Sequence, residues 1–172
     1  MSRIILITGG ARSGKSRLAD RLTASYGAPL GYLATGEPRD LEMDQRIVRH
    51  QERRGPEWTT LEEPLRLTET LAAHDNLFSA VLVDCITLWL TNLLLGYDDP
   101  SRVLATVREF ADAAPRLNTP LILVTNEVGM GIVPENRLAR TFRDLAGEAN
   151  ELLAATADEV HLVVSGIPMK LK

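Results

Sequence analysis

Gly9-Gly10-Ala11-Arg12-Ser13-Gly14-Lys15-Ser16 is the stretch of sequence that decides the fold. It matches the pattern G-x-x-x-x-G-K-[ST] and lies between an expected strand, Arg3–Thr8, and an expected helix, Lys15–Tyr26. The glycines let the backbone curl so that successive N–H groups point inward, and the start of the helix adds its positive dipole end. Lys15 supplies a point charge for the phosphates, and Ser16 a hydroxyl for Mg²⁺. The stretch therefore predicts a nucleoside triphosphate site rather than an ordinary glycine-rich turn.

The rest of the chain alternates apolar runs of strand length with longer segments of helical periodicity. Two runs, Val81-Leu82-Val83 and Leu121-Ile122-Leu123-Val124, are continuously apolar, which is typical of parallel strands covered on both faces. The order predicts a doubly wound α/β domain: one domain over residues 1–172, with a mostly parallel central sheet flanked by helices. The further expected strands are Leu30–Ala34, Ala80–Asp84, Leu121–Thr125, a buried Val160–Ser165 and an edge strand within Gly166–Leu171. The further expected helices are Asp40–Arg54, Glu63–His74, Ile86–Leu95, Pro100–Ala114 and Glu135–Thr156.

Composition excludes several classes of protein. A chain of 172 residues with 45% hydrophobic and 24% charged residues is typical of a globular domain, not of a disordered one. Its net charge of −4 provides no general attraction to nucleic acid or anionic lipid. The single cysteine, Cys85, can form neither an internal disulfide nor a zinc site. No apolar run reaches about 18 residues. We therefore expect a cytoplasmic protein with no membrane span and no nucleic-acid partner.

Two acidic residues are candidates for the ligand site. Asp84 closes the apolar run that begins at Ala80, so it should emerge at the carboxyl end of a central strand, where open α/β sheets bind ligands. There it could hold Mg²⁺ opposite Ser16, or cap the helix that starts near Ile86, and the two roles are compatible. Glu62 could start a helix or bind a ribose or base, and its spacing does not decide between them.

The segment Asp40–Arg54 is dense in charge and contains His50. Met43, Ile47 and His50 recur at helical spacing, so His50 should lie on or beside the packed face. Surrounding arginines disfavour imidazolium and favour the neutral ring, which can attack phosphorus. A solvated charged helix with an incidental histidine explains the same residues, and from the residues alone it is the stronger interpretation.

A polar loop, Asn126 to Arg137, follows a buried strand and should also open at the carboxyl edge of the sheet. The helix beyond it carries Arg137, Arg140 and Arg143 roughly on one side. That stripe could meet a phosphate, meet a neighbouring subunit or remain solvated.

Taken together, these residues resemble the bifunctional adenosylcobinamide kinase / adenosylcobinamide-phosphate guanylyltransferase family of cobalamin biosynthesis. The resemblance spans nearly the whole chain in order, and its most specific part is Asn126–Pro134. One small departure is Gly36, where alanine is expected. The matching pieces are Gly9–Ser16, Tyr32-Leu33-Ala34-Thr35, Asp40-x-Glu42-Met43-x-x-Arg46-Ile47-x-x-His50, Trp58-Thr59-Thr60-x-Glu62, Asp84–Leu93, Asn126–Pro134, Phe142–Gly147 and Val163–Pro168.

The resemblance implies a P-loop NTPase-like, RecA-like fold and two reactions at one nucleotide site. The terminal phosphoryl group of ATP or GTP passes to the hydroxyl of the aminopropanol arm of adenosylcobinamide. GTP then gives its guanylyl group to that phosphate through a guanylylated histidine, releasing pyrophosphate, and His50 is the matching position. The family implies Mg²⁺ as cofactor and a homotrimer with sites near subunit boundaries. The implied nucleotide contacts are Gly9, Gly10, Ala11, Arg12, Ser13, Gly14, Lys15, Ser16, Thr35, Gly36, Glu37, Gln51, Glu52, Arg53, Glu62 and Asp84.

Two other functions stay open. A monofunctional small-molecule kinase would share the phosphate loop, with His50 as a structural residue. A nucleotide-dependent switch or binding module would hydrolyse slowly and need no acceptor. The common guanine-reading segment N-K-x-D is missing from the sequence, which disfavours the switch.

Overall fold

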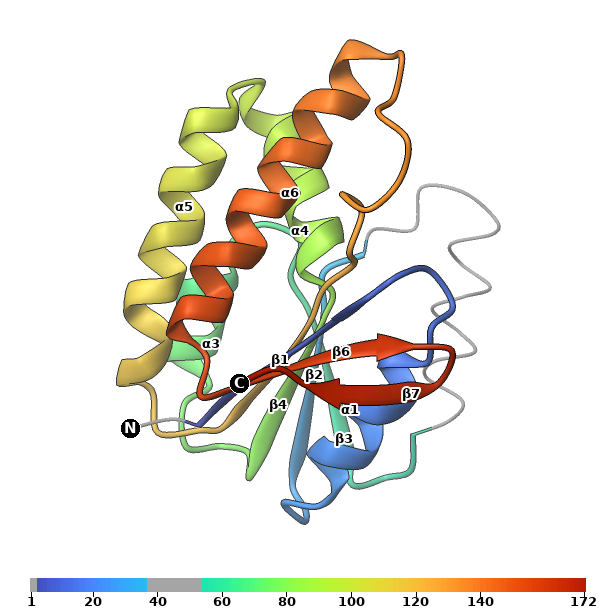
Figure 1. Cartoon of the computed structure of the whole chain (residues 1–172). Helices are drawn as coiled ribbons and strands as arrows, with labels where there is room; N and C mark the ends of the chain where they lie inside the picture. The colour runs from blue at the N-terminus through green and yellow to red at the C-terminus, as the bar shows by residue number, and fades with distance from the viewer. Residues whose placement is uncertain (1–2, 37–53) are drawn as a thin grey trace.

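The computed structural model describes residues 3–36 and 54–172. Within these residues, seven strands form one sheet in the order β3-β2-β4-β5-β1-β6-β7. All neighbouring strands pair in parallel except β6 and β7, which are antiparallel. Helix α1 covers one face of the sheet, and α3, α4, α5 and α6 cover the other (Figure 1). The strands are β1 Ile4–Gly9, β2 Leu30–Ala34, β3 Trp58–Glu62, β4 Ala80–Asp84, β5 Leu121–Val124, β6 Glu159–Val164 and β7 Ile167–Lys170. The helices are α1 Lys15–Ala24, α3 Leu67–Ala73, α4 Ile86–Tyr97, α5 Pro100–Ala113, the 3₁₀ turn Ala114–Arg116 and α6 Arg137–Thr156.

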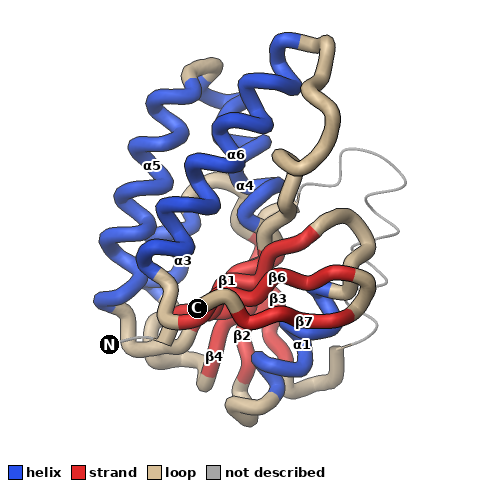
Figure 2. The backbone as a smooth tube through the Cα atoms, viewed as in Figure 1, coloured by secondary structure: helices blue, strands red, loops and turns tan. Residues whose placement is uncertain are grey.

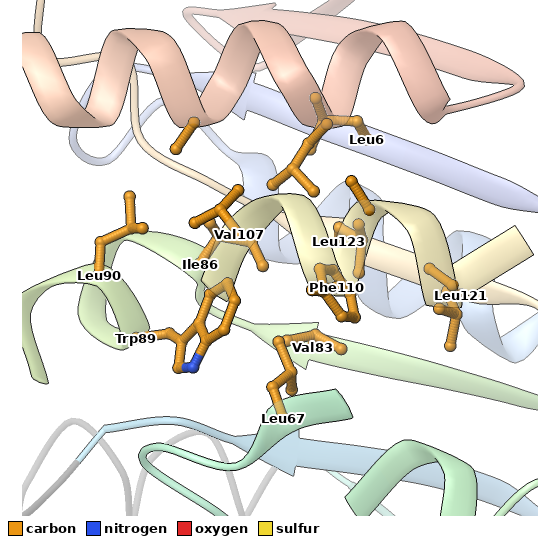
Figure 3. Close-up of a cluster of buried hydrophobic side chains, with 14 of the residues drawn as sticks. Leu6, Leu67, Val83, Ile86, Trp89, Leu90, Val107, Phe110, Leu121 and Leu123 are labelled. Atoms are coloured by element: carbon orange, nitrogen blue, oxygen red, sulfur yellow. The ribbon is translucent and has the colours of Figure 1, made fainter. Parts of the chain in front are cut away.

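The continuously apolar runs are central strands, as predicted. Helices cover both faces of the sheet at β4 and β5 (Figure 2). The buried side chains of these two strands alternate between two cores. The larger core lies under α3 to α6 and includes Trp89 of α4, whose ring meets Phe110 of α5 edge-on at a centroid distance of 5.6 Å (Figure 3). The smaller core lies under α1 and includes Leu18 and Ala19. This three-layer arrangement brings the carboxyl ends of the parallel strands to one edge.

Several expected elements differ from the observed ones at their boundaries. The helix expected from Glu63 begins at Leu67, because the Glu63 carboxylate accepts hydrogen bonds from the N–H groups of Leu65 and Arg66 in a preceding turn. The helix expected from Glu135 begins at Arg137, because the Asn136 side chain caps it by accepting from Ala139 N at 3.0 Å. Both differences come from a polar side chain that satisfies backbone N–H groups just ahead of the helix.

The structure differs from the sequence prediction at two strands near the sheet margins. Trp58–Glu62 forms the edge strand β3, in which Thr59 and Thr60 are exposed, so it has no continuous apolar run to reveal it. The expectation that the last long strand is buried is wrong for most of β6. Only Val160 and Val163 of β6 are buried, since β6 lies at the margin of the sheet, next to the exposed edge strand β7. Pro168 lies in β7, at the edge, as expected for a residue without an N–H.

Candidate functional site

The phosphate loop joins the end of β1 to the start of α1 and has a backbone that needs its glycines. A Cβ at Gly9 would lie 2.4 Å from the carbonyl oxygen of Val163, and Gly14 caps α1 with a φ of 101°. Arg12 also has a positive φ, 56°. The turn between β6 and β7 supports the loop, since Gly166 N donates to Ser13 O at 2.8 Å. The predicted strand–loop–helix context of the motif is confirmed.

Lys15 begins α1 and is buried, with 7% of its surface exposed. Its Nζ donates to the carbonyl oxygen of Gly10 at 2.6 Å, so the ammonium group is held over the loop. Ser13 Oγ is buried and has no hydrogen-bond partner among residues 3–36 and 54–172. Ser16 lies in the first turn of α1 and is partly exposed. The loop thus combines a buried cation, polar hydroxyls and the N-terminus of a helix, which is the chemistry that binds phosphate.

Asp84 ends β4 on the same side of the sheet as α1. Ala80 and Leu82 belong to the core under α1, and the two-residue period of a strand puts Asp84 on that face too. The hydroxyl of Tyr32 in β2 donates to Asp84 Oδ2 at 3.2 Å. The N-cap of α4 is Cys85, so the alternative that Asp84 caps this helix is wrong. Asp84 is therefore available for the ligand role.

Tyr32 lies between Asp84 and a buried arginine. The guanidinium carbon of Arg54 lies 3.3 Å from the centroid of the Tyr32 ring, and Arg54 Nη2 pairs with Asp20 Oδ1 at 3.2 Å. Burial, and then the neighbouring charge of Asp84, raise the pKa of Tyr32 above its ordinary value, while Arg54 acts in the opposite direction. The phenol therefore stays protonated and remains a hydrogen-bond donor.

Thr35 follows β2, and its hydrogen bonds join the end of β2 to the end of β4. Its hydroxyl donates to Cys85 O at 2.7 Å and accepts from Cys85 N at 2.9 Å, and its backbone N–H donates to Asp84 O. The residue is fully buried. Gly36 is next along the chain, where an added Cβ would meet Leu88 at 3.3 Å. The Thr35 hydroxyl is thus occupied by the turn that leads from β4 to α4.

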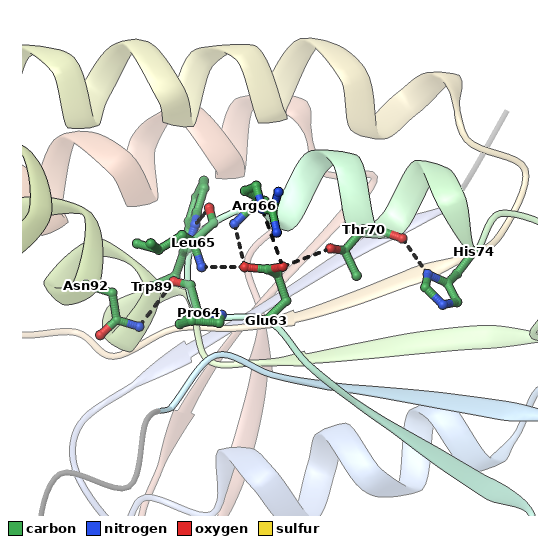
Figure 4. A network of polar contacts seen from close by, with 8 residues as sticks. All are labelled: Glu63, Pro64, Leu65, Arg66, Thr70, His74, Trp89 and Asn92. Carbon is green, nitrogen blue, oxygen red and sulfur yellow. Dashed lines mark hydrogen bonds and ion pairs between the residues drawn. The ribbon is translucent and has the colours of Figure 1, made fainter.

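Asn92 of α4 is a site-supporting residue that sequence reasoning missed. Its Nδ2 donates to Pro64 O at 3.2 Å (Figure 4) and also to Thr35 O at 2.8 Å. These two bonds join the segments that follow β2 and β3. Trp89, one turn earlier, donates from Nε1 to Leu65 O at 2.8 Å. The signal that could have found Asn92 is its chemistry, because a buried amide in an otherwise apolar helix needs specific partners.

Glu62 lies at the same sheet edge as Asp84. In the strand register Glu62 is opposite Ala34, and Ala34 is opposite Asp84. Two strand spacings separate Glu62 and Asp84, which is about 10 Å between their backbones. Glu62 ends β3 and is exposed, so the expectation that it starts a helix is wrong. Its carboxylate therefore faces solvent beside the strand ends that carry Thr35 and Asp84.

The loop from Asn126 to Asn136 stands next to the phosphate loop. Glu127 N donates to Gly9 O at 2.9 Å. Thr125 donates to Asn150 Oδ1 at 2.7 Å, and Asn150 Nδ2 donates to Asn126 O at 3.2 Å, which ties the loop to α6. Polar groups of β1 and α6 therefore fix the start of this loop at the ligand edge.

The arginine stripe of α6 has a use that none of the three sequence interpretations foresaw. Arg143 Nη2 donates to Gly129 O at 2.6 Å. Arg140 Nη1 donates to Pro134 O and Glu135 O. Arg137, by contrast, is exposed and lines a hollow between the N-terminus of α6 and Asp98. Two of the three guanidinium groups thus hold the polar loop in shape.

Five predicted site residues, Glu37, His50, Gln51, Glu52 and Arg53, lie outside the described residues. The residues that the structure brings to one edge are the phosphate loop, Thr35, Gly36, Glu62 and Asp84. Their roles toward a nucleotide stay predictions at this point.

The donors available for a metal ion are few. In the part of the chain that the structure describes, no group of three or more His, Cys, Asp or Glu side chains could hold a metal. The Ser16 hydroxyl and the Asp84 carboxylate are hard oxygen donors. A set this small suits Mg²⁺, which keeps several waters and is usually bound by one or two protein carboxylates together with substrate phosphates. The donor set therefore fits Mg²⁺ delivered with a nucleotide better than a metal in a closed protein site.

None of the helices within residues 3–36 and 54–172 has the length and apolar character required to cross a bilayer.

Comparison with known proteins identifies the family. The model of the family "Cobinamide kinase / cobinamide phosphate guanyltransferase" matches residues 5–171. This chain belongs to that family. It is thus an enzyme, a transferase related to cobinamide kinases and guanyltransferases, and the resemblance drawn from the sequence is confirmed.

Curated relatives from three bacteria agree. The chain is 47% identical to the "Bifunctional adenosylcobalamin biosynthesis protein CobP" of Pseudomonas aeruginosa, with 97% of this chain and 96% of the relative covered. It is 46% identical to the protein CobU of Escherichia coli, described in the same words, with 98% and 99% covered. The CobU protein of Salmonella typhimurium is 48% identical over the same shares.

A solved structure of similar fold is the KaiC-like protein of Pyrococcus horikoshii. The TM-score is 0.51 at 12% sequence identity, with 93% of this chain and 70% of that chain covered. This likeness concerns the fold alone. Together with the mostly parallel sheet and its flanking helices, it confirms the expected P-loop NTPase-like, RecA-like α/β fold.

Proposed function

We propose that this enzyme phosphorylates adenosylcobinamide with ATP or GTP and then transfers GMP from GTP, through a guanylyl-histidine at His50, to give adenosylcobinamide-GDP and pyrophosphate. The observation that carries the proposal is the phosphate loop, in which Lys15 Nζ lies 2.6 Å from Gly10 O at the sheet edge that Asp84 also reaches. The family and the bifunctional relatives support both reaction types.

In the kinase step, the cobinamide hydroxyl oxygen bonds to the γ-phosphorus. The bond between the γ-phosphorus and the β,γ-bridging oxygen breaks. The hydroxyl loses its proton, and ADP or GDP leaves. The backbone N–H groups of the loop and Lys15 hold the phosphates and stabilise the charge that develops on them. Positioning and charge neutralisation are sufficient here, so no covalent intermediate is needed.

In the guanylyl transfer, an imidazole nitrogen of His50 bonds to the α-phosphorus of GTP and pyrophosphate leaves. A phosphate oxygen of adenosylcobinamide phosphate then bonds to the same phosphorus, and the nitrogen–phosphorus bond breaks. The labile intermediate allows a weakly nucleophilic phosphate monoester to react. Lys15 stabilises the charge of the pyrophosphate leaving group.

Ser16 and Asp84 would hold Mg²⁺ with the nucleotide, and the ion would supply charge stabilisation at the phosphates. Glu62, exposed beside Thr35 and Gly36, is suited to the ribose or base. Thr35 would support the nucleotide site by holding strand ends in place, since its hydroxyl bonds Cys85, its N–H donates to Asp84 O and its carbonyl oxygen accepts from Asn92. Glu37, Gln51, Glu52 and Arg53 are further contacts that the family resemblance supports.

We further propose a cytoplasmic homotrimer, as the family resemblance implies. ATP and GTP, the proposed substrates, are cytoplasmic metabolites. Exposed apolar side chains along the β6–β7 edge, including Val164, Ile167 and Met169, offer surface for a subunit contact.

A coupled assay tests the two activities. The purified enzyme is incubated with adenosylcobinamide, Mg²⁺ and either ATP, GTP or both, and the corrinoid products are separated. The proposal predicts adenosylcobinamide phosphate with either nucleotide and adenosylcobinamide-GDP, with stoichiometric pyrophosphate, only when GTP is present. Phosphorylation that never proceeds to the GDP ester would instead identify a monofunctional kinase.

A further inference from the structure

Tyr32 is the one side chain that bonds the Asp84 carboxylate among the described residues. Tyr32 and Asp84 lie on neighbouring strands, with Tyr32 opposite Leu82 and therefore diagonal to Asp84 on the same face. An aromatic side chain is long enough to span such a diagonal. The contact is thus a direct consequence of the register of β2 and β4.

The Tyr32 ring is fixed from the other side. The Arg54 guanidinium stacks over it at 3.3 Å and lies 5.4 Å from the centroid of Trp58. The Arg54 side chain is only 5% exposed and is paired with Asp20 of α1. A cation over the ring face is attracted to it and draws electron density from the phenol, which strengthens the hydroxyl as a donor. Arg54 therefore holds the Tyr32 ring in place, with the hydroxyl directed at Asp84.

The hydrogen bond occupies one oxygen of the carboxylate. Oδ2 accepts from Tyr32, whereas Oδ1 makes no hydrogen bond with any residue that the structure describes. A hydrogen bond to one oxygen restrains rotation of the carboxylate, so the other oxygen has a preferred direction. Hydrogen bonds of this kind orient metal-ligating carboxylates in proteins.

We propose that Tyr32 is a positioning residue: its hydroxyl holds Asp84 in the orientation that receives the Mg²⁺–nucleotide complex. The inference rests on the proposed role of Asp84 in the nucleotide site. It assigns Tyr32 no contact with substrate. A purely structural role would come from the ring, which packs in the core under α1 beside Ala34 and Leu82, and Tyr32→Phe keeps that ring.

The test is a binding measurement that does not involve turnover. A fluorescent methylanthraniloyl GTP analogue with a methylene α,β-bridge is titrated into the whole enzyme, once with Mg²⁺ and once with EDTA. The ratio of the two dissociation constants measures how much the metal strengthens nucleotide binding. Tyr32→Phe is expected to lower this ratio about tenfold or more, as for loss of a hydrogen bond to a charged group, and to leave the EDTA value within twofold.

Tyr26→Phe is the matched control. Tyr26 packs against the same core, but at the opposite end of α1, so the same loss of a hydroxyl should leave the ratio unchanged. In an Asp84→Asn background, Tyr32→Phe should have no further effect on the ratio. A Tyr32→Phe ratio equal to that of wild type and Tyr26→Phe overturns the inference, and so does an equal loss of affinity with Mg²⁺ and with EDTA.

Asp84→Asn separates this inference from the proposed function. If Asp84→Asn lowers the ratio and Tyr32→Phe does not, Asp84 serves the metal complex without help from Tyr32, and only the inference fails. If Asp84→Asn leaves the wild-type ratio intact, the proposed metal role of Asp84 fails, and the inference fails with it.

Discussion

Lys15 is a cationic side chain that the fold keeps largely out of water. A buried ammonium group is costly unless it has partners, and here it donates to Gly10 O within the phosphate loop. Its position is set by the first turn of α1 and by glycines that no residue with a Cβ could replace at Gly9 without displacing Val163. The residue is thus pre-positioned for phosphate, with little reorganisation left for the reaction itself.

Lys15→Met should therefore lower kcat/KM for both reactions by about 100-fold or more, since both pass charge onto phosphate oxygens near this group. Steady-state assays of corrinoid phosphorylation and of pyrophosphate release give the two values. Lys172→Met, at the far end of the chain, is the control and should change neither. A Lys15→Met enzyme with kcat/KM within tenfold of wild type would refute the role assigned to the loop.

Glu159 at the start of β6 is a titratable residue outside the site. Arg3, Lys170 and His161 surround its carboxylate, and the hydrogen bond from Arg3 is the main cause that lowers its pKa from 4.5 to about 2. Because the folded pKa is depressed, the stability it contributes is present above pH 4.5 and is lost as the pH falls toward about 2.

Glu159→Gln should thus have a lower melting temperature than wild type at neutral pH, and the difference should shrink as the pH falls from 4.5 toward 2. Thermal unfolding followed by circular dichroism at several pH values measures it. A melting difference as large at about pH 3 as at neutral pH would show that the carboxylate charge is not what stabilises this cluster.

At the scale of elements, polar side chains join segments that the strand order brings together. Asp75, after α3, accepts hydrogen bonds from the backbone of Asn118 and Thr119 just before β5, and from the Thr119 hydroxyl. These bonds also lower the pKa of Asp75, against the opposing effect of burial. They lie at the amino ends of β4 and β5, the edge opposite the nucleotide site.

Asp75→Ala is therefore expected to lower the free energy of unfolding by about 1–3 kcal/mol, since several N–H groups lose a charged acceptor. The kcat/KM of both reactions should stay within twofold of wild type at a temperature where the variant is folded. Urea unfolding measures the first quantity and the coupled assay the second. Asp112→Ala, at an exposed position of α5, is the control and should change neither. Equal unfolding free energies for the two variants would contradict the account.

The elements that could be predicted from sequence are those with a strong periodic signal. The runs Ala80–Val83 and Leu121–Val124 are continuously apolar because helices cover both their faces, so the sequence predicts both strands. The edge strand Trp58–Glu62 has no such signal, because two consecutive exposed threonines separate its half-buried Trp58 and Leu61. The start of α3 at Leu67 depends on the Glu63 carboxylate, which accepts hydrogen bonds from backbone N–H groups ahead of the helix. Such a side-chain contact does not change the hydrophobic periodicity, so the periodicity could not predict it.

The candidate site could be predicted in part for the same reason. The phosphate loop is a contiguous motif, and Asp84 ends an evident strand, so both were found from spacing. The contacts of Tyr32, Asn92 and Arg143 were not predicted, because each acts through a partner distant in sequence. The Tyr32–Asp84 bond depends on the register of β2 with β4, and Arg143 reaches back 14 residues to Gly129. Their roles depend on contacts between residues distant in the chain, which could not be predicted from this one sequence.

At the scale of the whole molecule, the carboxyl ends of the parallel strands share one edge of the sheet. The last strand, β7, is exposed along its length. Four apolar side chains between Val164 and Leu171 are at least 44% exposed. Burial of this surface between subunits would be favourable. Sedimentation equilibrium is expected to give about three times the chain mass of 18.9 kDa. A monomer mass at all concentrations would exclude the homotrimer.

The central claim is that one site holds a triphosphate so that His50 can reach its α-phosphorus. The most direct test is incubation of the enzyme with Mg²⁺ and GTP labelled at the α-phosphate, followed by denaturation and detection of label on the protein. The account predicts an acid-labile, base-stable adduct in the wild type, its absence in His50→Ala, and its strong reduction in Lys15→Met. A His50→Ala enzyme that still carries the adduct, or a catalytically active wild type that never forms it, would contradict the account.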